Sequence, residues 1–199
     1  MIDHNFLALL LGLPAVAGLN PYATMLVLGV LVRTGLADGA IATPAFAVFG
    51  QPVFLAIAGT LYLLTLLSER IPLVDHVSDA VHFLVKPLAG ALIAFVLADS
   101  VSGDVPLPVL ALAAAFGGGA ISLVVHTTKA ASRIAVNVST VGVGAPFFAV
   151  LDDAAAFGVA GLLVLHPVLG VTLLLLVLLL GGVVVRKIIR AFGKRRKSG

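Results

Sequence analysis

Six long apolar stretches fill almost the whole chain, and few charged residues interrupt them. They cover approximately residues 5–34, 44–67, 75–98, 106–138, 145–165 and 168–190. A helix of about 20 apolar residues is long enough to cross the hydrocarbon core of a bilayer. Charged residues make up only 11% of the 199 positions, which is too little polar surface for a water-soluble domain of this size. The sequence therefore predicts an all-α fold, a polytopic transmembrane helical bundle of about six spans, and excludes a soluble enzyme.

The distribution of positive charge predicts the orientation of the bundle. Seven of the 12 Lys and Arg residues lie in residues 186–199, directly after the last apolar stretch. Such a basic run stays on the cytoplasmic side and attracts anionic lipid headgroups, and its place beside a span favours lipid over nucleic acid as its partner. We divide the chain into a transmembrane domain, 1–185, and a basic cytoplasmic tail, 186–199. With an even number of spans the N-terminus is predicted to be cytoplasmic too, in a multi-pass protein of the inner (plasma) membrane.

The number of spans depends on His166-Pro167, which separates the last two stretches. A tight turn there gives six spans, whereas a kink would merge the two stretches and give five. The charges support six, because an even count puts the Glu69-Arg70 loop and the basic end of the fourth stretch on the side of the tail.

Helix-breaking residues occur at two places. Gly18, Asn20 and Pro21 interrupt the first stretch, and Gly144 and Pro146 precede the fifth. Unwound backbone at membrane depth is tolerated only beside protein or a water-filled cavity. Both breaks have the order small residue, Pro, aromatic. We therefore predict two discontinuous helices, a pattern that an inverted repeat with a binding site between its halves would produce, with plain Pro kinks or loop ends as the alternative.

A stripe of ionisable residues runs along the third stretch. Its members recur at helical spacing and share one narrow face: Asp75, Asp79, His82 and Lys86. Glu69 can join them from the preceding loop. Ionisable groups in a span are costly, so they face protein or water and find partners. We predict that this stripe lines a polar cavity on the cytoplasmic side and couples a proton or a cation.

Three of these side chains also have metal-ligand chemistry. Asp75, Asp79 and His82 offer two carboxylates and an imidazole at spacings that suit Mg²⁺, Mn²⁺ or Zn²⁺. The same spacing arises in ordinary helices. A divalent metal cofactor is therefore one interpretation, and a helix face without metal is the other.

A second stripe, on the fourth stretch, is basic. Four of its residues are candidates for binding an anion: His126, Lys129, Arg133 and Asn137. Together they could hold a phosphate or a carboxylate, with the Arg in bidentate geometry. We predict that Asp79 pairs with Lys129 or Arg133. The alternative is that buried ion pairs between the two stripes serve packing alone.

Two adjacent acidic residues, Asp152 and Asp153, follow the second break. Neighbouring residues on a helix point about 100° apart, given 3.6 residues per turn. Only one of the two carboxylates is therefore expected to face the basic stripe, with the other at an interface.

The block Glu69–His82, followed by Lys86–Ala91, resembles the signature of a bacterial integral-membrane domain-of-unknown-function family, number four-one-two-six. The stretch His126–Thr140 and the pair Asp152-Asp153 are similar to its second half. That family often has Asn-Pro where Ala145-Pro146 stands and Glu-Asp where the acidic pair stands. The resemblance implies a compact multi-span helical protein and brings no activity with it.

Three functions fit these features. The first is a small transporter or permease for a small anion or an anionic lipid headgroup. The second is a membrane-embedded, metal-dependent enzyme that acts on a lipid phosphate, and the third is a structural or assembly protein. We favour the transporter, because the sequence contains no recognised catalytic motif. Its small-molecule or ion substrate stays open, as does assembly into a homo-oligomer.

Overall fold

The computed structural model of the chain describes residues 4–37, 41, 43–68, 72–98, 107–140 and 145–195. Within these ranges the chain is all helical, with no strand. The elements are α1 (His4–Leu19), α2 (Pro21–Thr34), the 3₁₀ helix η2 (Pro44–Val48), α3 (Pro52–Ser68), α4 (Pro72–Ala98), α5 (Leu107–Thr140), α6 (Ala145–Leu165) and α7 (Pro167–Arg195). The predicted all-α fold is confirmed. α7 continues without a break through the predicted boundary between domain and tail at residue 185.

Apolar side chains cover the outside of the bundle, and several polar side chains lie inside it. Phe116 is 80% exposed and Leu179 is 67% exposed, whereas Asn20 and His126 are each 4% exposed. So many large apolar side chains on the surface are unusual in a water-soluble protein, and such a surface is typical of contact with a membrane or another apolar partner. Among the described residues, two helical segments are long and apolar enough to cross a membrane, Val81–Ala98 of α4 and Pro108–Val136 of α5.

The first apolar stretch forms two helices rather than one. α1 ends at Leu19, α2 begins at Pro21, and Asn20 between them is extended, with φ −146° and ψ 106°. Proline at the first position of α2 has no backbone N–H to satisfy and is preset for a helical φ. The predicted discontinuity at Gly18, Asn20 and Pro21 therefore lies where the sequence indicated.

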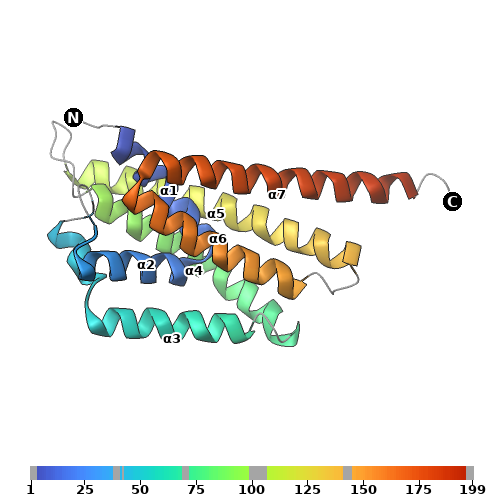
Figure 1. Cartoon of the computed structure of the whole chain (residues 1–199), viewed down its shortest axis with the longest axis horizontal. Helices are drawn as coiled ribbons and strands as arrows, with labels where there is room; N and C mark the ends of the chain where they lie inside the picture. Colours follow the sequence, from blue (N-terminus) through green and yellow to red (C-terminus); the bar gives the residue numbers. More distant parts are fainter. Residues whose placement is uncertain are drawn as a thin grey trace.

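The break reverses the direction of the chain. The Asn20 side chain bonds to Asp153 of α6. Gly12 of α1 packs against Leu163, ten residues further along α6, and Val27 of α2 lies beside α6 at a similar level. Moving away from Asn20 along either helix therefore leads to the same end of α6. α1 and α2 form a re-entrant hairpin with its tip at Asn20, drawn in blue (Figure 1).

Helices α3 to α7 run along the bundle in alternating directions (Figure 1). The first turn of α1 lies at the same end as the α6–α7 turn, since Asn5 and His166 border one small hollow there. α7 ends at the opposite end of the bundle. The structure thus does not confirm six spans. The predicted orientation of the termini is not confirmed either: because the hairpin returns the chain to the end where it began, α1 begins and α7 ends at opposite ends of the bundle.

The second predicted break falls at a helix end, and so does Pro52 of the second apolar stretch. Pro52 begins α3 instead of lying inside a span, and Pro146 stands in the first turn of α6. Gly144 lies outside the described residues. The second break therefore separates α5 from α6, and the inverted repeat is not confirmed. His166 is the single residue between α6 and α7, which fold back on one another, so it forms a turn and not a kink.

Glycines allow three helices to approach closely. Gly18 of α1 lies against the backbone of Ser122 in α5, so a Cβ at residue 18 would clash with that carbonyl. Gly90 of α4 and Gly118 of α5 face each other in the same way. Small residues at such crossings are the usual means by which helices pack in an apolar solvent. This packing fixes α5 directly beside the end of α1.

Gly118→Ala is therefore expected to lower the melting temperature of the detergent-purified protein. The added methyl group would meet the Ala94 side chain and the Gly90 carbonyl, and overpacking of this kind costs about 1–3 kcal/mol. Gly117→Ala is the matched control, because nothing lies within 4 Å of a Cβ there. Equal melting temperatures for the two variants would contradict the close approach of α4 and α5.

Candidate functional site

The start of α2 is capped by the residue that breaks the helix. The Asn20 side-chain oxygen accepts hydrogen bonds from the backbone N–H groups of Tyr22, at 3.1 Å, and Ala23, at 3.0 Å. The Asn20 carbonyl accepts from the Thr24 hydroxyl at 2.8 Å. A helix start leaves N–H groups without partners, and an Asn cap satisfies them. On the α2 side of the break, the polar groups of Asn20 are thus hydrogen-bonded to the first turn of α2.

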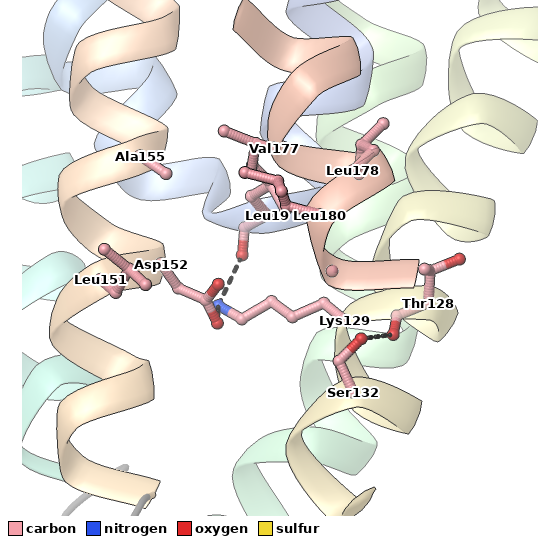
Figure 2. Close-up of a pocket in the computed structure, with 11 residues that line it drawn as sticks. Leu19, Thr128, Lys129, Ser132, Leu151, Asp152, Ala155, Val177, Leu178 and Leu180 are labelled. Carbon is pink, nitrogen blue, oxygen red and sulfur yellow. Dashed lines mark hydrogen bonds and ion pairs between the residues drawn. The ribbon is translucent and has the colours of Figure 1, made fainter. Parts of the chain in front are cut away.

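The end of α1 is met by a cation from α5. Lys129 Nζ donates a hydrogen bond to the Leu19 carbonyl at 3.1 Å. The same ammonium lies 3.4 Å from Oδ2 of Asp152 in α6, and the two side chains are only 8% and 15% exposed. The last carbonyls of a helix carry partial negative charge, which a cation stabilises. Figure 2 shows the extended Lys129 side chain reaching from α5 toward Asp152.

The second acidic residue faces the hairpin and not the lysine. Asp153 Oδ1 accepts a hydrogen bond from the Asn20 side-chain amide at 2.8 Å. Its Oδ2 accepts a longer one, of 3.4 Å, from the Tyr62 hydroxyl of α3, and the Tyr62 ring packs edge-on against Phe157. The buried carboxylate thus sits beside the positive, N-terminal end of α2. We name Asn20, Lys129, Asp152 and Asp153 the tip cluster.

A second buried group of polar residues lies between α4 and α5. Lys86 Nζ lies 3.1 Å from Nδ1 of His126, and the Ser122 hydroxyl donates to the Lys86 carbonyl at 2.7 Å. An ammonium has only donors, so this contact requires His126 to accept through Nδ1. His82 is buried in the same region, with its ring edge-on to Tyr22. We name His82, Lys86, Ser122 and His126 the α4–α5 cluster.

The structure divides the predicted anion set between these two clusters. His126 lies in the α4–α5 cluster, whereas Lys129 lies in the tip cluster. Arg133 follows one turn later on α5 and is half-buried, and the side chain of Asn137 lies outside the described ones. Lys129 pairs with Asp152, because the hairpin tip brings α6 to that ammonium, and the side chain of the predicted partner Asp79 lies outside the described ones.

The predicted acidic and metal-binding stripe is only partly described. Asp75 and Asp79 lie in the first turns of α4, but their side chains are outside the described ones, and Glu69 lies outside the described residues altogether. Within the described side chains, no group of three His, Cys, Asp or Glu residues could hold a metal ion. The metal site at Asp75, Asp79 and His82 therefore stays a prediction.

Sequence reasoning missed two contributors to the tip cluster. One is the Leu19 carbonyl, which no side-chain pattern reveals. The other is Tyr62, one of two tyrosines in the chain, whose hydroxyl within an apolar stretch could have indicated a buried polar partner.

A cavity of about 260 Å³ opens beside the tip cluster (Figure 2). Lys129 and Asp152 are the charged groups in its wall, and Thr128 and Ser132 add hydroxyl groups from α5. The rest of its lining is apolar or small: Leu19, Leu151, Ala155, Val177, Leu178, Leu180 and Gly181. The cavity therefore joins a polar end at the hairpin tip to an apolar body between α5, α6 and α7.

These features define a class of protein: an all-helical bundle with an apolar exterior and a re-entrant hairpin whose tip is held by buried charges. Residues 7–187 match the family described as Domain of unknown function (DUF4126), and the chain belongs to that family. The resemblance seen in the Glu69–His82 block is thereby confirmed. No curated protein and no solved structure matched the chain.

Exchanging the two partners across the hairpin tip tests its geometry. Asn20→Asp keeps an acceptor for the α2 cap but removes the amide donor and places two carboxylates together, so the melting temperature is expected to fall. The double variant Asn20→Asp with Asp153→Asn restores one donor and one acceptor, and it should recover most of the loss. Thermal unfolding in detergent measures both. A double variant no more stable than Asn20→Asp would contradict the assigned bond.

Proposed function

We propose that the protein is an integral membrane transporter or permease for a small anion or an anionic lipid headgroup, and that its substrate binds at the tip cluster. The apolar exterior supports a bilayer as the solvent of the bundle. Buried ionisable groups support a pathway, because such groups within spans are costly and serve ions, protons or substrates. Under this proposal the basic end of α7 faces the cytoplasm and anionic lipid.

The observation that carries the proposal is the charged hairpin tip. A helix pair that enters the bundle and turns back leaves non-helical backbone at depth, which is stable only against protein or a wet cavity. Here Lys129 and Asp153 meet the two open helix ends, and the cavity lies directly beside Lys129. Interrupted helices with their ends directed at a common point are the usual substrate sites of transporters.

The lining of the cavity supports an anion with some apolar character as the substrate. Lys129 has three N–H donors, and the Leu19 carbonyl and Asp152 are its acceptors among the described residues. The ammonium can therefore donate to a ligand oxygen in the cavity. A phosphate or carboxylate oxygen suits that donor, and the apolar wall of α6 and α7 suits an acyl chain or a small apolar group.

Filling the cavity is expected to weaken substrate binding without unfolding the protein. Gly181 lines the cavity, and nothing lies within 4 Å of a Cβ placed there, so Gly181→Leu projects into open space. We expect this variant to weaken anion binding by at least about tenfold, or about 1.4 kcal/mol. The measurement is titration of the purified protein with acetate, dimethyl phosphate and dihexanoyl phosphatidylglycerol, followed by uptake of the bound anion into proteoliposomes.

Gly182→Leu is the matched control, since Gly182 is exposed, has equal space and does not line the cavity. Its affinity and uptake should stay at the wild-type level. Equal loss in both variants would place the site elsewhere. Wild-type protein that binds none of the three anions would support a structural role for the buried ion pairs.

A further inference from the structure

We infer that an anion binds Lys129 together with a proton on Asp152, so that the protein takes up the two in a one-to-one ratio. The inference rests on the proposed function and deepens it by naming the co-substrate. It starts from the fact that the lysine already has an anionic partner: Asp152 Oδ2 lies 3.4 Å from Lys129 Nζ at the wall of the cavity. A substrate anion must therefore compete with a carboxylate that belongs to the chain.

Among the described side chains, few groups around Lys129 could carry the charge change; α4 and the preceding turn of α5 contribute Lys86 and His126, which contact each other. α1 contributes the Leu19 carbonyl and α6 contributes the two carboxylates. α3 contributes the Tyr62 hydroxyl, and α7 lines the cavity only with apolar residues and glycine. On α5, Arg133 follows Lys129 by one turn and keeps its charge at any physiological pH.

Charge balance then sets the stoichiometry. An anion placed beside the ionised Asp152 would put two negative charges against the one Lys129 ammonium in a largely buried site, where the penalty is high. A proton on a carboxylate oxygen of Asp152 cancels one of these two charges. Lys129 then pairs with the incoming anion in place of Asp152, and the total charge of the tip cluster is the same before and after binding.

Geometry distinguishes Asp152 from its neighbour as the proton site. Both oxygens of Asp153 accept hydrogen bonds, from Asn20 and from Tyr62, and this carboxylate holds the hairpin tip. Asp152 lines the cavity, and Lys129 is its ion-pair partner among the described residues. Lys129 can keep its bond to the Leu19 carbonyl during the exchange, so the hairpin tip stays capped while the anion replaces the carboxylate.

The test is titration calorimetry of the detergent-purified protein with dimethyl phosphate, a phosphodiester whose charge does not change over the pH range used. Dihexanoyl phosphatidylglycerol carries the same phosphodiester on a lipid and distinguishes a headgroup site from a site for a free anion. Binding that takes up one proton should tighten as pH falls, by up to about tenfold per pH unit. Buffers with different ionisation enthalpies should report uptake of one proton per anion.

Asp152→Asn imitates the protonated carboxyl. This variant should bind the phosphodiester with an affinity that does not change with pH, at least as tightly as wild type at low pH, and without proton uptake. Asp153→Asn removes the neighbouring carboxylate and leaves the Asp152–Lys129 pair in place, so its binding, whatever its affinity, should still tighten as pH falls. The calorimetric proton count on wild-type protein tests the inference even where a variant fails to fold.

Anion binding without proton uptake, or a pH dependence that survives in Asp152→Asn, would overturn the inference and leave the proposed transporter intact. If the pH dependence were lost in His126→Gln instead, the proton site would lie in the α4–α5 cluster, which would also overturn the inference about Asp152. Absence of binding at every pH, in wild type and in Asp152→Asn alike, would overturn the proposed function itself.

Discussion

A helix that ends inside an apolar bundle leaves its last carbonyls without partners, and a helix that begins there leaves its first N–H groups without partners. Each of these groups needs a hydrogen bond or a charge from elsewhere in the protein. In this protein both ends lie at one residue, Asn20, because α1 stops immediately before it and α2 starts immediately after it. The Asn20 side chain accepts hydrogen bonds from the first N–H groups of α2, and Lys129 donates one to the last carbonyl of α1. The two acidic residues of α6 are then the partners of these two groups, Asp152 of the Lys129 ammonium and Asp153 of the Asn20 amide. The polar contacts described here within the tip cluster follow from the single reversal of the chain.

This arrangement also explains how the remaining helices are placed. The hydrogen bond from Lys129 joins α5 to the end of α1. The two helices can approach this closely because Gly18 has no side chain where it packs against Ser122. Asp153 brings α6 to the start of α2 and, through Tyr62, to α3. α7 covers the side of the cluster with apolar residues and leaves the cavity between itself, α5 and α6. The structural requirement of the hairpin and the proposed binding chemistry therefore use the same lysine.

Much of the helix pattern could be predicted from the sequence, because Gly18, Asn20 and Pro21 have few roles in an apolar stretch other than to break it. The reversal could not be predicted from the break, since a kinked span and a hairpin share that signal. Spacing along α5 marks Lys129 as a polar position, and one carboxylate of the pair Asp152-Asp153 is expected to face that stripe. No spacing within one helix identifies which residue of another helix it meets, so the pairing of Lys129 with Asp152 could not be predicted.

In the proposed membrane protein, the hairpin of α1 and α2 enters and leaves on one side of the bilayer. The chain contains no cysteine, so single cysteines can be introduced at His4, Leu36 and Lys187 without background labelling. Each variant, reconstituted in oriented vesicles, is treated with a membrane-impermeant maleimide from one side at a time. We expect residues 4 and 36 to react from the same side and residue 187 from the opposite one. Reaction of residues 4 and 36 from opposite sides would show a single crossing and contradict the hairpin.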